Sequence, residues 1–170
     1  LASPPSLNLN DRTWIIHTRS EERPPVRISS SATVSDSLIT DGSVIADGAI
    51  VERSVLSPGV YVGPRAVIRD SVIFSDVYIE AGATVERCII DKTAVIGSNS
   101  RVGQIKDMGD LGITCIGKKT QIPEGYTIGH GCIIGPDLGL EDFAQFGNKI
   151  ISNGVEFGYS KRHMTDRPKD

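Results

Sequence analysis

The sequence contains few aromatic residues and no long apolar stretch. Phe, Trp and Tyr make up 5% of its 170 residues. No run approaches the roughly 18 consecutive apolar residues that a membrane-spanning helix needs, and the first residues lack the apolar core of a signal peptide. The net charge is −3, whereas proteins that bind nucleic acid carry a basic surface. We therefore expect neither a membrane nor a nucleic acid as a partner.

Cysteine is also scarce. The three cysteines are Cys88, Cys115 and Cys132, and an odd number without a paired framework favours a reducing compartment, here the cytoplasm. Neither a CxxC motif nor a Cys/His pair occurs at the spacing of zinc ligands, so no metal site is expected. Cys88 and Cys132 fall on small, inward positions of the repeat described next, which predicts that both are buried.

A repeat dominates the middle of the chain. Aliphatic residues recur at intervals of six, five and six positions, so that equivalent residues such as Ile28 and Ile45 lie 17 positions apart. A fixed period of this kind indicates a solenoid. The aliphatic residues form three columns, which are Ile28, Ile45, Val62, Ile79 and Ile96; Val34, Val51, Ile68, Val85 and Val102; and Ile39, Leu56, Ile73 and Ile90.

Two further regularities identify the type of solenoid. A small or β-branched residue stands two positions before each aliphatic one, and alternate residues of a strand point to the same face, so both point inward. Residues that tolerate a left-handed backbone mark the corners, namely Gly42, Gly48, Gly59, Gly82 and Asn99. The pattern predicts an all-β fold, a left-handed parallel β-helix of hexapeptide repeats with three sides per coil. A sandwich or barrel of short antiparallel strands has no reason to keep this register.

The breaks in the repeat divide the chain. Residues 1–27 do not repeat and are expected to form an extended arm that packs Trp14 against the first coil and covers its open end. The β-helix is expected over 28–135, interrupted by a polar, Gly-containing loop at 103–115 that leaves the solenoid on one face. Residues 136–170 are expected to form a C-terminal cap and a frayed tail.

Within the cap, two features are expected. The large apolar residues Leu138, Leu140, Phe143 and Phe146 fit a short capping turn. Residues 149–151 and 154–157 fit an added strand pair. The polar residues 160–170 make up the frayed tail.

Several short motifs, in one order along the chain, are shared with one enzyme family. The N-terminal segment contains Leu7-Asn8-Leu9, Asp11-Arg12, Trp14-Ile15-Ile16-His17-Thr18 and Pro24-Pro25-Val26. The coils contain Ser54-Val55-Leu56, Asp70-Ser71-Val72-Ile73, Cys88-Ile89-Ile90-Asp91-Lys92, Ile96-Gly97, Gly112-Ile113 and Ile122-Pro123-Glu124-Gly125. In this order they resemble the β-helix of ADP-glucose pyrophosphorylases (glucose-1-phosphate adenylyltransferases) and the segment that joins it to the catalytic domain.

The resemblance implies a function for a larger protein. Such enzymes join glucose 1-phosphate and ATP into ADP-glucose and release pyrophosphate, for glycogen or related glucan synthesis, with Mg²⁺ held by an N-terminal catalytic domain. Nothing in this chain resembles the Gly-rich nucleotide loop of that domain. The sequence opens without Met and with Pro4 and Pro5, so we expect a fragment that lacks the catalytic domain, needs no cofactor and is inactive alone. The β-helix is expected to hold subunits together, typically in a tetramer, and to help receive allosteric effectors.

The register of the repeat places two lysines together. If the loop replaces a corner between the second and third columns, Ile116 stacks on Ile90, and Lys92 and Lys118 face outward one coil apart. Neighbouring strands are about 4.8 Å apart, and two ammonium groups that close repel each other unless an anion lies between them. The resemblance points to the same two positions, where relatives bind phosphate or phosphorylated sugars and acids. Weaker candidates for the same patch are Lys119, Arg101 and Lys106.

Other interpretations remain open at this point. Both lysines also fit ordinary solvated surface residues. A free-standing hexapeptide acyltransferase would need an imidazole base, and His130 is the histidine that falls in a coil. A β-helix enzyme with zinc would need several histidines on adjacent coils, and a non-catalytic assembly scaffold would need none.

Overall fold

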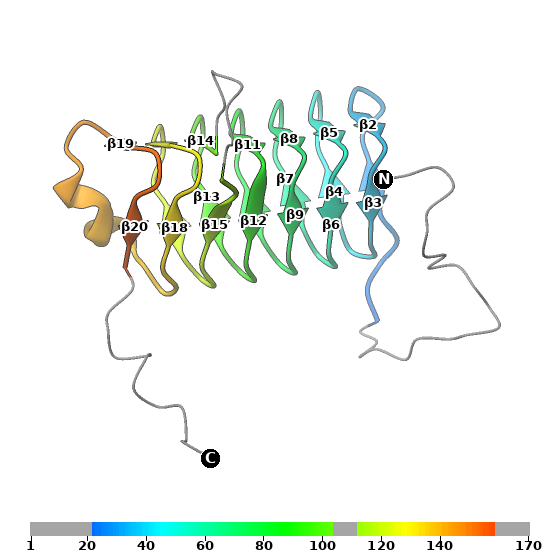
Figure 1. The fold of residues 1–170 in the computed structure, drawn as a ribbon. Coiled ribbons are helices and arrows are strands. Elements are labelled where there is room, and N and C mark those ends of the chain that lie inside the picture. Colours follow the sequence, from blue (N-terminus) through cyan, green and yellow to red (C-terminus); the bar gives the residue numbers. More distant parts are fainter. Residues whose placement is uncertain (1–21, 104–111, 159–170) are drawn as a thin grey trace, which may run out of the picture.

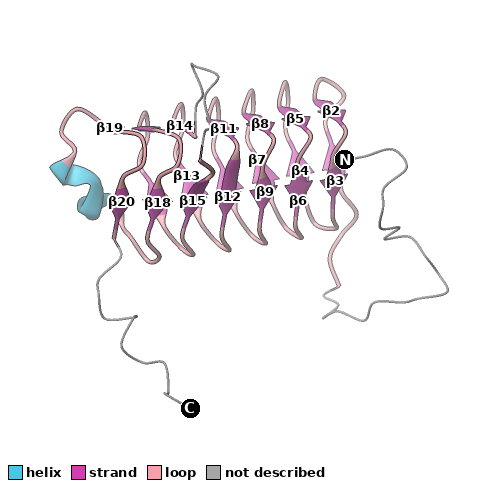
Figure 2. Ribbon diagram, viewed as in Figure 1, coloured by secondary structure: helices cyan, strands magenta, loops and turns pink. Residues whose placement is uncertain are grey.

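The chain forms a solenoid of short parallel strands. The computed structural model describes residues 22–103 and 112–158, and Figure 1 shows them winding into a straight stack of coils. Three parallel sheets, here called A, B and C, make the three sides of the prism, and Figure 2 shows the sides as rows of strands joined by short turns. The predicted left-handed parallel β-helix is confirmed.

Each predicted column of aliphatic residues lies on one sheet. Sheet A contains β1 (Arg27–Ile28), β4 (Val44–Ile45), β7 (Tyr61–Val62), β10 (Tyr78–Ile79), β13 (Val95–Ile96) and β16 (Gln121–Ile122). Sheet B contains β2 (Thr33–Ser35), β5 (Ile50–Glu52), β8 (Val67–Arg69), β11 (Thr84–Glu86), β14 (Arg101–Val102), β17 (Thr127–Ile128) and β19 (Ile150–Ile151). Sheet C contains β3 (Leu38–Ile39), β6 (Val55–Leu56), β9 (Val72–Ile73), β12 (Cys88–Ile90), β15 (Thr114–Ile116), β18 (Ile133–Ile134) and β20 (Glu156–Phe157).

The core is a narrow stack of aliphatic side chains. Equivalent residues pair in register from coil to coil, as in Ile79 with Ile96 and Val85 with Val102. From Ile45 onward the column residues up to Ile134 are almost fully buried. Burying one such side chain stabilises the fold by about 1.5–3 kcal/mol. Small residues such as Ala49 and Ala83 are buried beside them, two positions before a column residue.

Corners between the sides require a left-handed backbone. Gly42, Gly59 and Gly82 have φ between +69° and +76°, as the sequence predicts. Asn99, also predicted, has a φ of 57°. Other corners carry non-glycine residues with positive φ that the pattern did not predict, and these are Asp36, Arg53, Arg65, Asp70, Asp76, Arg87, Thr93, Lys119, Asp137 and Lys149. Stacking of coils therefore holds many residues in a conformation that costs about 1–2 kcal/mol for an ordinary L-residue.

The two ends of the solenoid differ. At the C-terminal end the 3-10 helix η1 (Leu140–Gln145) inserts the fully buried Phe143, whose ring meets Tyr126 and Phe157 edge to face. At the N-terminal end Ile28 is 49% exposed. The predicted covering of this end by Trp14 lies outside the described residues and stays a prediction.

The segment after residue 135 adds to the sheets. A short helical turn is present at η1, as expected. The two short strands that follow do not pair with each other in the described structure, because β19 pairs with β17 and β20 with β18. The reason is that Ile151 and Phe157 are six residues apart, which returns the chain to the coil register after η1. Sheets B and C therefore extend beyond residue 135.

Among the described residues, no helix has the length and apolar character needed to cross a membrane.

Candidate functional site

The strand register brings Lys92 and Lys118 to the same place on adjacent coils. β12 and β15 pair in parallel with Ile90 opposite Ile116, which confirms the predicted stacking. The inserted loop, whose residues 104–111 lie outside the described part, leaves between β14 of sheet B and β15 of sheet C. At the corner that follows the paired isoleucines, the backbone N of Lys119 donates to the carbonyl O of Lys92 at 3.0 Å. Lys92 and Lys118 therefore occupy equivalent corner positions and both are exposed.

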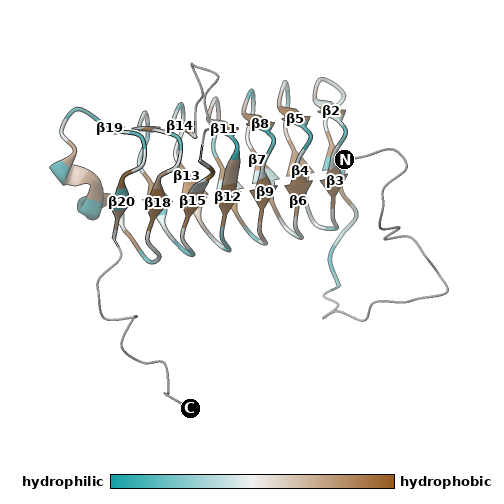
Figure 3. Cartoon of the chain, in the orientation of Figure 1, coloured by the Kyte–Doolittle hydropathy of each residue, from teal (hydrophilic) through white to brown (hydrophobic). Residues whose placement is uncertain are grey.

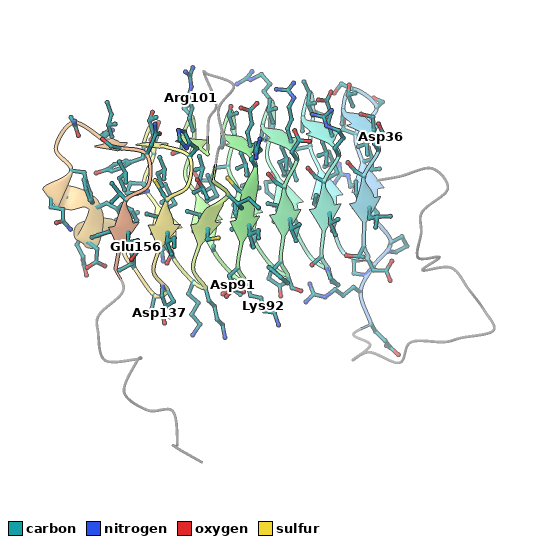
Figure 4. The ribbon with its side chains drawn as sticks, in the orientation of Figure 1. Asp36, Asp91, Lys92, Arg101, Asp137 and Glu156 are labelled. Atoms are coloured by element: carbon teal, nitrogen blue, oxygen red, sulfur yellow. The ribbon has the colours of Figure 1, made fainter. Side chains whose placement is uncertain are left out.

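These corners connect sheet C to sheet A. We call the row of equivalent left-handed residues along this edge the C–A corner row, and it consists of Gly42, Gly59, Asp76, Thr93, Lys119 and Asp137. Lys92 and Lys118 immediately precede Thr93 and Lys119 in this row. Figure 4 shows Lys92 and Asp91 on the edge of the prism, with Asp137 further along the same edge.

The backbone is strained beside Lys92. Thr93 has a φ of 58°, which is rare for a β-branched residue. Two local hydrogen bonds hold this corner: the Thr93 hydroxyl donates to the Lys92 carbonyl at 2.6 Å, and the Lys92 backbone N donates to Asp91 Oδ1 at 2.7 Å. Strained residues persist where the surrounding structure imposes them, often at functional sites. The corner thus presents the Lys92 side chain from a fixed backbone.

Like charges are stacked at this position. Within residues 22–103 and 112–158, no ion pair is found for Lys92, Lys118 or Lys119. The acidic residues of the same row are Asp76, which already binds Arg23, and Asp137, whose backbone N donates to the Lys118 carbonyl at 2.8 Å. Three ammonium groups on two adjacent corners favour an anion with several oxygen acceptors, such as a phosphate.

The weaker candidates are divided by the structure. Lys119 lies beside Lys118 on the C–A corner row. Arg101 lies on β14 of sheet B, the side of the prism opposite this edge, so in this chain it does not join the lysines; Figure 4 shows it far from Lys92. Lys106 lies outside the described residues.

Arg23 is a further residue of this edge that sequence reasoning missed. Its Nη1 donates to Asp76 Oδ1 at 2.6 Å and its Nη2 to Oδ2 at 3.1 Å. The side chain crosses the corners at Gly42 and Gly59, and a Cβ at Gly59 would overlap the guanidinium. The hydrogen bond from Arg23 lowers the pKa of Asp76, against the opposing effect of partial burial. The sequence feature that could have indicated this ion pair is the two successive corner glycines before Asp76, Gly42 and Gly59, which leave space for a long side chain.

The residues of the rival functions are placed differently. His130 lies at the corner between β17 and β18, where its backbone N donates to Asn153 Oδ1 at 3.2 Å. The described residues contain no group of three or more His, Cys, Asp or Glu side chains that would hold a metal ion. Cys88 and Cys132 are buried as predicted, and burial raises the pKa of both thiols.

Known proteins resemble this chain at the level of sequence. Glucose-1-phosphate adenylyltransferase of Thermomicrobium roseum is 45% identical over 174 aligned positions, which cover 84% of this chain and 35% of that protein. The enzymes of the same name from Acetivibrio thermocellus and Pseudothermotoga lettingae are 35% and 40% identical and cover 82% of this chain and 34% of each relative. The resemblance predicted from the motifs is confirmed. The chain spans about a third of the length of these curated relatives.

A comparison with solved structures gives a more distant similarity. The acetyltransferase domain of PglB from Neisseria gonorrhoeae FA1090 has 28% sequence identity and a TM-score of 0.37, over 80% of this chain and 56% of that chain. A superposition this loose carries no functional inference. Residues 25–110, in contrast, match a family model described as "GlmU-like, C-terminal hexapeptide". The chain therefore belongs to the GlmU-like, C-terminal hexapeptide family.

Proposed function

We propose that this chain is the C-terminal regulatory and oligomerisation domain of a glucose-1-phosphate adenylyltransferase. The whole enzyme would form ADP-glucose and pyrophosphate from glucose 1-phosphate and ATP, with Mg²⁺ bound in an N-terminal catalytic domain, for glycogen or related glucan synthesis in the cytoplasm. The support is that relatives of this name match more than four-fifths of the chain, while the chain spans only about a third of each of them. The β-helix would hold subunits together in a tetramer and would be inactive alone.

The observation that carries the regulatory role is the stacking of Lys92 on Lys118. Their corners are joined by the backbone hydrogen bond from Lys119 to Lys92, so the two side chains start one strand spacing, about 4.8 Å, apart. Bringing two ammonium groups together costs free energy that a bound anion recovers through charge-assisted hydrogen bonds. We propose that phosphate or a phosphorylated sugar or acid binds here, together with basic residues of the catalytic domain.

Regulation then follows from differential binding. An anion that contacts Lys92 and Lys118 on one side and the catalytic domain on the other stabilises the arrangement of the two domains that makes both contacts. Such coupling typically changes affinity by about 5- to 150-fold. The anion activates the enzyme if the arrangement that it stabilises is the more active one, and inhibits the enzyme if that arrangement is the less active one.

The first experiment tests the enzyme. The full-length gene product is purified from its source and assayed for ADP-glucose formation from glucose 1-phosphate, ATP and Mg²⁺, beside the 170-residue chain. We expect activity in the full-length protein and none in the chain. A native product of the same mass as this chain, without this activity, would contradict the proposal and favour a free-standing acyltransferase or a scaffold.

The second experiment tests the anion site in the active full-length enzyme. Lys92→Ala and Lys118→Ala are each compared with Lys149→Ala, which removes an exposed lysine that donates to the Glu124 carbonyl away from the C–A corner row. We expect the concentration of inorganic phosphate or phosphorylated sugar needed for half of the response to rise by about fivefold or more in the first two, with unstimulated turnover retained. An unchanged response in both would refute the effector role of these lysines.

A further inference from the structure

The outer face of sheet C carries a continuous row of apolar side chains. The row runs in register across six strands through Leu38, Val55, Val72, Ile89, Cys115 and Ile133. Leu38, Val72 and Ile89 are each exposed by 36–40%, and the other three are partly exposed. Figure 3 shows the sheet C strands from β3 to β18 coloured as hydrophobic along this side.

The same positions on sheet B are different. There the outer row is mixed, because polar or charged residues are interspersed with apolar ones along Thr33, Ile50, Val67, Thr84, Arg101, Thr127 and Ile150. Beside this row Arg69 forms ion pairs with Glu52 and Glu86 at 2.8 and 3.1 Å. The apolar row of sheet C is bordered by charged corners on both long edges, Arg53 and Asp70 on one and Lys92 on the other. An apolar centre with a polar rim is the usual composition of a protein interface.

The size of the row limits what it binds. Six strands spaced about 4.8 Å apart make a strip about 24 Å long and one short strand wide, so its exposed area is on the order of a few hundred Å², comparable to the largest apolar patch on a typical monomer. A stable complex of separate molecules usually buries about 800 Å² on each partner. A domain tethered to the same chain binds through a smaller face, because the tether raises its effective concentration.

The chain itself places a tether beside this face. Arg23 is fixed to Asp76 on the C–A corner row, the edge that sheet C shares with sheet A, so the described part of the chain begins at this edge. The part that matches this chain makes up only about a third of each curated relative. We infer that the outer face of sheet C is the surface on which the domain preceding residue 22 docks. This inference rests on the proposed function, since it takes the preceding domain to be the catalytic one.

Docking on this face would also complete the anion site. Lys92 lies two residues beyond Ile90 at the end of β12, on the rim of the apolar row. A domain seated on Val72 and Ile89 reaches the lysines from the sheet C side with its own basic residues. The apolar contact then holds the two domains in one arrangement, and the anion at the rim binds only when both domains contribute their basic residues.

Cys115 is a native reporter of this face. It belongs to the row and is partly exposed, whereas Cys88 and Cys132 are buried with a raised thiol pKa. The rate of maleimide labelling of Cys115, read from its peptide by mass spectrometry, is measured in the full-length protein and in the 170-residue chain. We expect labelling about tenfold slower or more in the full-length protein, as for an undocked state populated to about 10% or less. Equal rates in an enzyme that forms ADP-glucose would overturn the inference and leave the proposed function standing.

Two variants of the full-length protein sharpen the result. Ile89→Lys places a charge in the middle of the row and should restore fast labelling of Cys115. Thr84→Lys places the same charge on the outer face of sheet B in the same coil and should leave Cys115 protected. Release by both variants alike would refute a specific role of sheet C.

Other occupants are separated by two further readouts. Protection that rises with protein concentration would show that a second copy covers the face and would overturn the inference.

Sheet A carries a second partly apolar row in which Tyr61 and Tyr78 stack with ring centroids 4.3 Å apart. Tyr78→Lys should not release Cys115, and release by Tyr78→Lys but not by Ile89→Lys would move the docking surface to sheet A and refute the assignment to sheet C.

Discussion

Two edges of the prism have the same left-handed backbone but different arrangements of charge. The corners between sheets B and C carry Asp36, Arg53, Asp70 and Arg87, one on each successive coil, all with positive φ. Their charges alternate, and Arg53 donates two hydrogen bonds to Asp70 at 2.7 and 2.9 Å. The hydrogen bond from Arg53 also lowers the pKa of Asp70. This edge, which we call the alternating row, satisfies its charges within the chain, and Figure 4 labels Asp36 at its first coil.

The C–A corner row begins in the same way and then departs from it. Arg23 and Asp76 form an ion pair on the early coils, but the next two corners carry Lys92, Lys118 and Lys119. A row that neutralises itself needs no ligand, whereas a row of like charges is stabilised by one. The difference separates a structural edge from a candidate binding edge, although single residues of the two rows look alike in the sequence.

The largest expected effect on stability comes from filling the space that the Arg23 side chain occupies over Gly59. Gly59→Ala introduces a Cβ at a φ of 76°, where it would also overlap the Arg23 guanidinium and approach Asp76. We expect a loss of about 2 kcal/mol in the free energy of unfolding, measured by urea denaturation. Gly154→Ala is the matched control, because Gly154 has a similar φ of 69° and nothing lies within 4 Å of a Cβ there. An equal, small effect of both substitutions would mean that Arg23 is not held along this row.

A smaller effect of opposite sign is expected beside Lys92. Thr93→Asn replaces a β-branched residue at a φ of 58° with one that tolerates the left-handed region. We expect a gain of about 0.5–1 kcal/mol in the free energy of unfolding, partly offset by the lost hydroxyl hydrogen bond. The response to phosphate should persist, because both lysines remain. A destabilised variant would show that the hydrogen bond outweighs the strain.

The acid dependence of stability distinguishes the ion-paired parts of the two rows from the rest. The folded-state pKa values of Asp70 and Asp76 are lowered by Arg53 and Arg23. Their stabilisation is therefore fully present above the unfolded pKa of about 3.9 and is lost as the pH falls through the lower folded values. Because both carboxylates are partly exposed, each should contribute about 1 kcal/mol or less. In thermal unfolding below pH 5, Asp70→Asn and Asp76→Asn should each flatten the pH profile, and an unchanged profile would contradict the pairing.

The smallest effect on stability, and the sharpest contrast, comes from reversing one charge in each row. Arg53→Asp puts three acids side by side and should lower the midpoint of thermal unfolding. Lys118→Asp places an acid beside Lys92 and should be neutral or stabilise by a few tenths of a kcal/mol, while removing the phosphate response. Destabilisation by both reversals would mean that Lys118, like Arg53, already forms a stabilising charge pair within the chain.

The sequence predicted those residue positions that follow from the 17-residue period. The 17-residue repeat places Ile116 on Ile90, and from that register Lys92 and Lys118 follow by counting two residues. Counting also puts Arg101, one residue before Val102, on the outer face of sheet B, which excludes it from the patch. The Arg23–Asp76 pair was not predictable in this way, because its partners are 53 residues apart and meet through side-chain reach over glycine corners. The strands β19 and β20 were misassigned as a pair because η1 hides their return to the coil register.

The most direct test of the anion site is binding itself. Isothermal titration calorimetry with inorganic phosphate is carried out on the full-length protein, its Lys92→Ala and Lys118→Ala variants, and the Lys149→Ala control, at constant ionic strength. We predict saturable binding in the unaltered protein and in Lys149→Ala, with affinity at least about fivefold weaker in the two corner variants. Equal affinity in all four proteins would show that phosphate binds elsewhere, and would contradict the assignment of the C–A corner row as the effector site.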